Sequence, residues 1–319
     1  MEQLPDLPPT TRLSPLVLRI LGGNPSKFTL QGTNCYLIGS GPKRILLDTG
    51  EGKPVFASSL RQALKDENAT IEKVLLSHWH PDHVGGVSDV LALPGCEGAE
   101  VLKHQPTARQ EAVADGEVIA YEPPPGQIEI DDGQVIRTEG ATLRALHCPG
   151  HTVDHMAFIL QEEDAMFTGD NVLGHGTAVF EDLGAYMSSL ELMEKQFAGR
   201  AYPGHGDVIS DGKGKVGEYI RHRRQREGEV VDVLGTKRED GHEGWTSMEI
   251  VKVVYRQYPE HLHGPAEGGV VQVLRKLEGE GGGGEVVFDG EGGAVKILDM
   301  RNCMKDAICT YSTNYADAR

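Results

Sequence analysis

The stretch VLLSHWHPDHVGG, residues 74–86, places three histidines and an aspartate within six positions directly after an apolar run. The apolar residues are typical of a buried strand, and His78, His80, Asp82 and His83 come where that strand ends. A polar surface turn would explain one or two of these histidines. Four metal-capable side chains in so short a segment favour a metal site instead.

Three further segments repeat this arrangement of apolar strand, tight turn and ligand-type residue. His151 follows LRALHCPG, Asp170 follows AMFTG, and His205 follows AYPG. Because ligands gather at strand ends in α/β proteins, we expect these side chains to converge with the first four. Seven nitrogen and oxygen donors exceed the four that one tetrahedral zinc ion takes, so the sequence predicts two ions.

The predicted ligands form two groups with one shared member: His78, His80 and His151 for one ion, Asp82, His83 and His205 for the other, and Asp170 bridging them. This donor set suits zinc and leaves manganese and iron open. Two divalent ions acidify water toward neutral pH, which provides a nucleophile without a Ser or Cys side chain.

The wider chain has a pattern of strands followed by helices. From about residue 16 to 206, apolar runs of four to seven residues alternate with Gly, Pro, Asn and Asp, which predicts strands with some helices between them. Later segments predict three helices, the third over GGVVQVLRKLE, and two short strands, EVVF and AVKIL. Thr246, three residues before Glu249, marks a helix start. These elements indicate a small winged-helix-like unit.

Composition narrows the class of protein. The net charge is −17, which argues against a protein that binds nucleic acid through general basic character. The five cysteines are scattered and form no CxxC pair, which favours a reducing compartment. No apolar run is long enough to span a bilayer, and the first residues match no targeting signal. We therefore expect a soluble, cytoplasmic protein with no membrane partner.

The segments SHWHPDHVGG, DTG at residues 48–50, CPGHTVDHM, FTGDNVLG and YPGHG resemble the metallo-β-lactamase superfamily over about residues 12–278. The segments GGNPSKFTLQGTNCYLIGSGPKRILLDTGEG, GTAVFEDLGAYMSSL and YIRHRRQRE resemble a narrower group. It includes fungal lactamase-like thioesterases, which release aromatic polyketides from acyl carrier protein, and lactamase-like endoribonucleases.

The resemblance implies an α/β fold, namely an αββα metallo-β-lactamase sandwich with the metals at one edge. Its ligands correspond to the seven residues named above. We expect the lactamase-like domain over residues 12–210, a helical winged-helix-like extension over 211–300, and a disordered tail over 301–319. The Gly-Glu run within residues 279–285 is expected to be a mobile loop.

The resemblance also implies a function: a two-zinc hydrolase that cleaves a polyketide thioester from the acyl carrier protein domain of a non-reducing polyketide synthase. Asp82 would then be catalytic as well as a ligand, because it would accept a proton from the attacking water. Two alternatives stay open. One is an endoribonuclease for single-stranded RNA, and the other is a glyoxalase II-like thioester hydrolase. Residues 213–278 hold 12 Lys and Arg against 11 Asp and Glu, which counts modestly against RNA.

Four residues near the predicted ligands have weaker signals. Asp48 would either orient a ligand or form an ordinary strand-end turn. We expect His155 to make structural hydrogen bonds and Cys148 to be a core thiol, and His175 is a candidate for contact with substrate.

Overall fold

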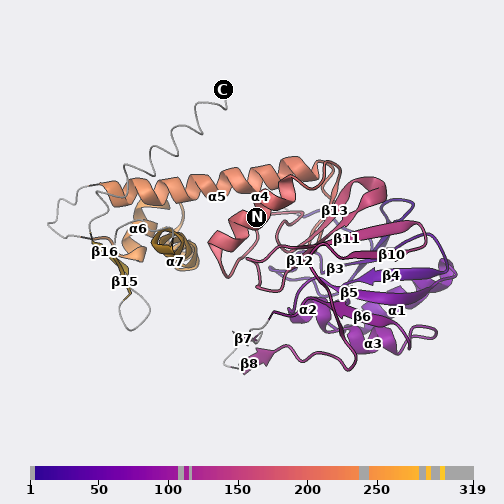
Figure 1. The fold of residues 1–319 in the computed structure, drawn as a ribbon. Coiled ribbons are helices and arrows are strands. Elements are labelled where there is room, and N and C mark those ends of the chain that lie inside the picture. The colour runs from indigo at the N-terminus through magenta and orange to yellow at the C-terminus, as the bar shows by residue number, and fades with distance from the viewer. Residues whose placement is uncertain are drawn as a thin grey trace. The chain divides into compact units, whose positions relative to one another are not determined.

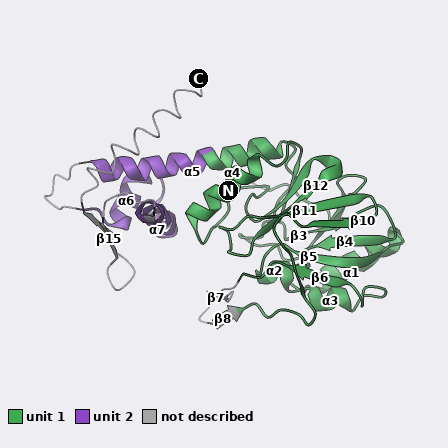
Figure 2. Cartoon of the chain, in the orientation of Figure 1, with its two compact units in different colours: residues 1–220 green, residues 221–319 purple. Residues whose placement is uncertain are grey.

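The computed structural model describes residues 4–106, 111–114, 117–236, 244–279, 285–288 and 295–298. The chain divides into two compact units, Met1–Ile220 and Arg221–Arg319, coloured separately in Figure 2. This boundary falls inside helix α5 (Gly212–Gly235), and the expected domain limits stay a prediction. The centre of the Gly-Glu run and the tail after residue 300 lie outside the described residues.

The first unit contains two packed β-sheets (Figure 1). The seven-stranded sheet has the order β1 (Thr10–Arg12), β2 (Val17–Leu21), β3 (Asn34–Ile38), β4 (Lys43–Leu47), β5 (Thr70–Leu76), β6 (Glu100–Lys103) and β9 (Ile128–Glu129). The five-stranded sheet has the order β10 (Val135–Thr138), β11 (Ala141–His147), β12 (Met156–Leu160), β13 (Ala165–Gly169) and β14 (Ala201–Pro203). A separate hairpin pairs β7 (Glu111–Ala114) with β8 (Glu117–Ala120).

Strand β3 shows how the sheets pack, because all five of its residues are buried. Successive side chains of a strand point to opposite faces. Tyr36 and Ile38 join a core cluster with Phe158 and Phe167 of the second sheet. Cys35 and other residues on the opposite face join a second cluster under the helices. A strand that is apolar on both faces therefore lies in the middle of the layers.

Helices cover the outer faces of both sheets. Helix α1 (Pro54–Asp66) buries Phe56, Leu60 and Leu64 in the second cluster, to which the short helix α3 (Val87–Leu91) also contributes. Helix α4 (Leu183–Glu194) lies along the other sheet and buries six of its residues (Figure 1). The predicted αββα sandwich is thus confirmed.

The parallel strand pairs decide where polar side chains collect. In the first sheet β4 is parallel to β5, and in the second sheet β13 is parallel to β14. Each pair therefore ends at one edge of its sheet. Asp48 follows β4, the segment 77–80 follows β5 and leads into helix α2 (Pro81–Val84), Asp170 follows β13, and His205 follows β14.

The second unit contains the rest of α5, then α6 (Ser247–Val254), α7 (His263–Gly279) and a hairpin of β15 (Glu285–Phe288) and β16 (Val295–Leu298). Short 3₁₀ turns span Gln161–Glu163 in the first unit and Glu260–Leu262 in the second. Helix α6 begins with the predicted capping box, in which Thr246 and Glu249 each bond the other's backbone N–H. Helix α7 begins five residues before the expected start. Among the described residues, no helix combines the length and apolar character needed to cross a membrane.

Candidate metal centre

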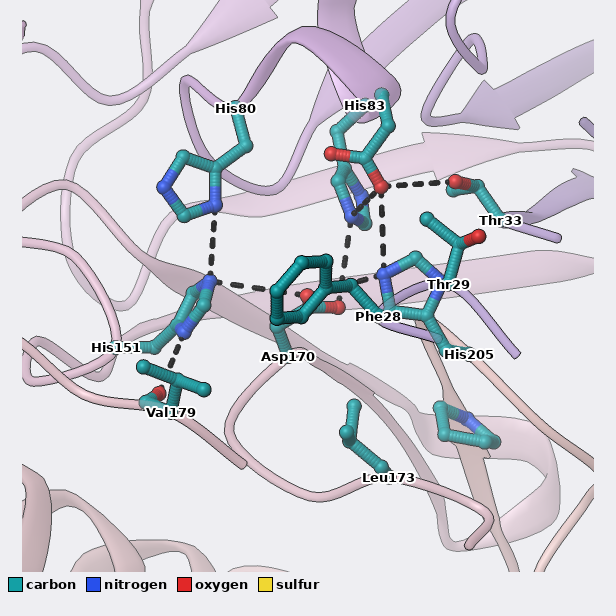
Figure 3. Close-up of polar contacts among 12 residues, drawn as sticks. Phe28, Thr29, Thr33, His80, His83, His151, Asp170, Leu173, Val179 and His205 are labelled. Atoms are coloured by element: carbon teal, nitrogen blue, oxygen red, sulfur yellow. Dashed lines mark hydrogen bonds and ion pairs between the residues drawn. The ribbon is translucent and has the colours of Figure 1, made fainter. Parts of the chain in front are cut away.

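All seven predicted ligands lie close together at the edge where the strand pairs end. Figure 3 labels five of them: His80, His83, His151, Asp170 and His205. The possible ligand atoms form three overlapping groups, and the atoms of each group lie within 4.8 Å of one another. The groups are His78, His80 and His151; His78, His83 and Asp170; and Asp82, His83 and His205. The first sheet and α2 supply four of the residues, and the second sheet supplies three. The site therefore depends on packing of the two sheets.

Three imidazoles form the first group. The Nε2 atom of His78 lies 3.0 Å from Nδ1 of His80 and 3.2 Å from Nε2 of His151, and the last two atoms are 3.1 Å apart. Three nitrogens on a tetrahedral zinc ion, with bonds of about 2.0–2.1 Å, would be separated by about 3.3 Å. The observed triangle is close to that size.

Hydrogen bonds on the far side of two rings show which nitrogen carries the proton. His151 donates from Nδ1 to the carbonyl of Val179 at 2.7 Å, which leaves Nε2 with its lone pair. The hydroxyl of Ser77 donates to Asp48, so it accepts from Nδ1 of His78 at 3.0 Å. The Nε2 atom of His78 is then also unprotonated. Lone pairs that converge at this distance repel each other unless a cation lies between them.

The second group combines imidazoles with carboxylates. His205 Nε2 lies 3.1 Å from Asp170 and 3.3 Å from Asp82. His83 Nε2 lies 3.3 Å from Asp82 and 3.5 Å from Asp170. His83 donates from Nδ1 to Asp48 at 2.8 Å, so its Nε2 atom is the one that faces the two carboxylates.

That His83 nitrogen and Oδ1 of Asp170 are both buried and have no hydrogen-bond partner within the described part of the chain. Such orphaned atoms are uncommon in a folded protein unless a ligand satisfies them. Asp170 also lies 3.7 Å from His151, so its carboxylate reaches both groups. The residues present therefore fit two cations with Asp170 between them.

The charges differ between the two groups. Burial lowers the pKa of His78 and His151 and lowers that of His80 to about 4, and neighbouring imidazoles add to the effect at His78 and His80. These three rings are neutral at pH 7 and can bind a metal. For His83, burial again disfavours the charged form, but nearby carboxylates outweigh it and raise the pKa. The second group therefore holds a positive charge, whether from a proton or from a metal ion.

Both aspartates of the second group are ionised. Burial would raise the pKa of Asp170, but His205 and His83 outweigh it and hold that pKa well below the ordinary value. Burial acts in the same direction on Asp82, where His83 has the largest opposing effect and the pKa is again lowered. The Asp82 side chain is 23% exposed and that of Asp170 is 11% exposed. Asp82 is thus the more solvent-exposed of the two carboxylates.

Local backbone geometry allows the side chains of the predicted ligands to lie this close together. Gly204 precedes His205, and a Cβ atom at this position would lie 2.2 Å from Oδ1 of Asp170. Asp48 has a φ of +59°, a conformation that Asp tolerates better than most residues. That conformation lets its carboxylate accept from the backbone N–H and the hydroxyl of Ser77 and from His83. Of the two readings of Asp48, the ligand-orienting one matches these contacts.

Several other residues have clear places in the site. His155 accepts a hydrogen bond from the backbone N–H of Asp170 at 3.1 Å, which matches the expectation that it makes structural hydrogen bonds. Cys148 is fully buried, as expected of a core thiol. His175 is exposed. The sequence reading missed Thr33, whose hydroxyl donates to Asp82 at 3.0 Å, and Ser77. Ser77 could have been suspected because it directly precedes His78, whereas Thr33 is 49 residues from Asp82.

Comparison with protein families agrees with this geometry. Residues 28–205 match the model of the metallo-beta-lactamase superfamily, and residues 246–282 match the beta-lactamase associated winged helix domain. Two solved structures share the fold. A metallo-beta-lactamase family protein from Thermus thermophilus has a TM-score of 0.66 at 23% identity, covering 90% of this chain and 100% of that one. A beta-lactamase domain protein from Burkholderia ambifaria has a TM-score of 0.72 at 18% identity, covering 91% and 94%.

Curated relatives are more similar in sequence. A protein of Aspergillus chevalieri named atrochrysone carboxyl ACP thioesterase is 44% identical over 305 residues, which are 94% of this chain and 92% of that protein. A protein of the same name from Passalora fulva is 42% identical, covering 94% and 86%. The lactamase-like protein ptaB of Pestalotiopsis fici is 43% identical, covering 86% and 84%. With its fold, its clustered ligands and these matches, the chain belongs to the metallo-beta-lactamase superfamily.

Proposed function

We propose that this chain is a two-zinc thioesterase that hydrolyses a polyketide thioester carried by an acyl carrier protein. The observation that carries the proposal is the convergence of seven nitrogen and oxygen donors in two groups that share Asp170. Relatives more than 40% identical to this chain bear the name of ACP thioesterases, which supports the substrate class.

The assignment of ligands follows the two groups: His78, His80 and His151 would hold one ion, Asp82, His83 and His205 would hold the other, and Asp170 is within reach of both groups. Bound zinc ions supply Lewis acidity and bring the pKa of water close to neutrality. The protein's own contribution is to keep the first three imidazoles neutral and the carboxylates ionised in a nearly dry edge of the sandwich.

Asp82 has the additional role of proton acceptor. Its carboxylate is ionised, better exposed than that of Asp170, and held in place by Thr33. The attacking water loses a proton as it adds to the thioester carbonyl, and Asp82 receives it. The thiolate then leaves without needing a strong general acid, because a thiol is already moderately acidic.

The partner in this proposal is the acyl carrier protein domain of a non-reducing polyketide synthase, and the location is cytoplasmic. The acyl carrier protein presents its acyl group on a flexible arm as a thioester, so the enzyme needs to receive only that arm at the metal edge.

A turnover assay tests the proposal. Zinc-loaded protein would be offered, in separate reactions, an aromatic polyketide thioester on acyl carrier protein, a single-stranded RNA and a glutathione thioester, with Asp82→Ala as the control in every arm. Thioester hydrolysis that disappears in Asp82→Ala, with RNA untouched, is the expected result. RNA cleavage with the thioester untouched would overturn the proposal in favour of an endoribonuclease. Equal activity on a glutathione thioester would indicate a glyoxalase II-like enzyme.

A further inference from the structure

Two exposed apolar side chains, Phe28 and Val179, belong to segments that are hydrogen-bonded to the predicted metal ligands. Phe28 is 67% exposed and Val179 is 68% exposed, which are the two highest values for large apolar residues in the described part of the chain. In the view of Figure 3 the Phe28 ring is drawn in front of Asp170, with Leu173 and Val179 below it. Apolar groups left in water at a catalytic edge are typical of a surface that binds an apolar ligand.

The turn that carries Phe28 is ordered by its own hydrogen bonds. The hydroxyl of Ser26 accepts the backbone N–H groups of Phe28 and Thr29, each at 3.1 Å. Thr29 donates its hydroxyl to the carbonyl of Asn24, and Leu30 takes a φ of +57° that reverses the chain. Phe28 is therefore held outward by a turn whose polar groups are satisfied within the turn.

The same turn is linked to the metal ligands through Asn24. Its side chain accepts the backbone N–H of Thr33 at 3.0 Å and donates to the Thr33 hydroxyl at 3.1 Å. That hydroxyl donates in turn to Asp82. The position of the Phe28 turn is thus fixed relative to the residue that would accept the proton.

Val179 is fixed relative to the other group of ligands. Its carbonyl accepts from His151, while its side chain stays exposed. The next residue, Phe180, stacks on Tyr186 with ring centroids 5.1 Å apart, and Glu181 donates its backbone N–H to Gly150. The exposed side chain of Val179 is thus carried by backbone that is hydrogen-bonded at Val179 itself and two residues later.

One face of the Phe28 ring already has a neighbour. The ammonium group of Lys27 lies 4.7 Å from the ring centroid, a cation–π distance. The opposite face is the one available to a ligand. An aromatic ring and a β-branched side chain are both stiff, so a flat ligand that contacts them would cost little rotamer freedom on the protein side.

We propose that Phe28 and Val179 are the specificity-determining walls for the acyl group, and that Phe28 stacks on a planar aromatic acyl chain. This inference rests on the proposed thioesterase function and adds the residues that select the acyl group. A flexible aliphatic chain would gain less, because it cannot stack and loses more conformational freedom when it is bound.

The test compares an aromatic and an aliphatic ligand on the zinc-loaded full chain. Hydrolysis of 2-naphthoyl and octanoyl thioesters of N-acetylcysteamine would be measured for the wild type and for Phe28→Ala, Phe28→Trp and Val179→Ala. Leu192→Ala is the matched control, because Leu192 is also an exposed apolar residue (37%) but lies on α4 and is not one of the two proposed acyl-binding residues. Binding of free 2-naphthoate and octanoate would be measured by calorimetry on the same proteins.

Phe28→Ala should raise KM for the naphthoyl thioester and Kd for naphthoate about tenfold, corresponding to about 1.4 kcal/mol. The octanoyl values should change less than about threefold, and kcat should stay near the wild-type value. Phe28→Trp should restore naphthoyl binding, Val179→Ala should weaken it by about threefold, and Leu192→Ala should leave it unchanged.

Equal losses on both acyl groups, or no change in naphthoate binding, would overturn the inference. If the wild type hydrolyses neither thioester, the proposed function fails, yet the binding measurement still decides the role of Phe28. Failure of wild-type protein to bind naphthoate at all would also overturn the inference.

Discussion

Replacing Ser77 by alanine is expected to weaken metal binding without touching a ligand. The Ser77 hydroxyl is buried, donates to Asp48 at 2.8 Å and accepts from Nδ1 of His78 at 3.0 Å. In Ser77→Ala the Nδ1–H of His78 loses its acceptor, so the tautomer that points the Nε2 lone pair at the metal is no longer favoured. An unsatisfied buried donor costs about 1–3 kcal/mol. If the whole of that cost falls on the metal-binding tautomer, zinc affinity drops by about 5-fold to 150-fold. This span includes the roughly 10-fold to 100-fold losses typical of residues that orient metal ligands.

The assay is competition between the protein and a chromogenic zinc chelator, accompanied by urea unfolding of the metal-free protein. Ser247→Ala is the control, because Ser247 is equally buried and its hydroxyl donates to Glu267 in the second unit. That variant should lose folding stability and keep the zinc affinity of the wild type. Unchanged zinc affinity in Ser77→Ala would refute the argument that this hydroxyl selects the His78 tautomer.

Other perturbations give distinct outcomes. Asp82→Ala should abolish hydrolysis in a turnover assay and lower bound zinc while the protein stays soluble, because Asp82 lies on the short helix α2 and outside the core. Asp154→Leu should destabilise folding by about 3–5 kcal/mol in urea titrations because it removes the carboxylate that balances the buried ammonium of Lys103. Adding Lys103→Met should recover most of the loss, and no recovery would contradict a role for the ion pair. In metal-free protein, His80 takes up its proton at about pH 4 when folded, compared with about 6.5 when unfolded, so it costs stability progressively as pH falls from 6.5 toward 4. His80→Ala should reduce that loss, and an unaltered pH profile of unfolding would argue against it.

The fold and the clustering of the seven predicted ligands could be anticipated from the sequence because their signals are local. Each of these residues lies within a few positions of the end of an apolar strand, and the strands are short runs bounded by Gly, Pro, Asn or Asp. The capping box at Thr246 and Glu249 is equally local, and the structure confirms it. The start of α7 was missed because Gly264 and Pro265 fall in its first turn, and both residue types are poor helix formers when only propensity is considered.

The residues that hold the ligands could not be predicted, because they depend on packing between distant segments. The Thr33 hydroxyl meets Asp82 only after β3 is placed beside the β14 loop, where Thr33 bridges to His205. The carbonyl of Val179 that binds His151 belongs to the backbone, so no residue type signals it. From the sequence alone, Phe28 would be expected to lie in the core. Only its exposure in the folded chain suggests that it contacts a ligand.

The most direct test of the two-metal centre is a count of bound ions. Zinc would be measured by plasma mass spectrometry after dialysis for the wild type, His80→Ala and His205→Ala, because each variant removes a ligand from only one of the two groups. We expect two zinc ions per chain in the wild type and about one in each variant. One ion per chain in the wild type, or two ions retained in both variants, would contradict the assignment of these seven side chains to a shared two-metal site.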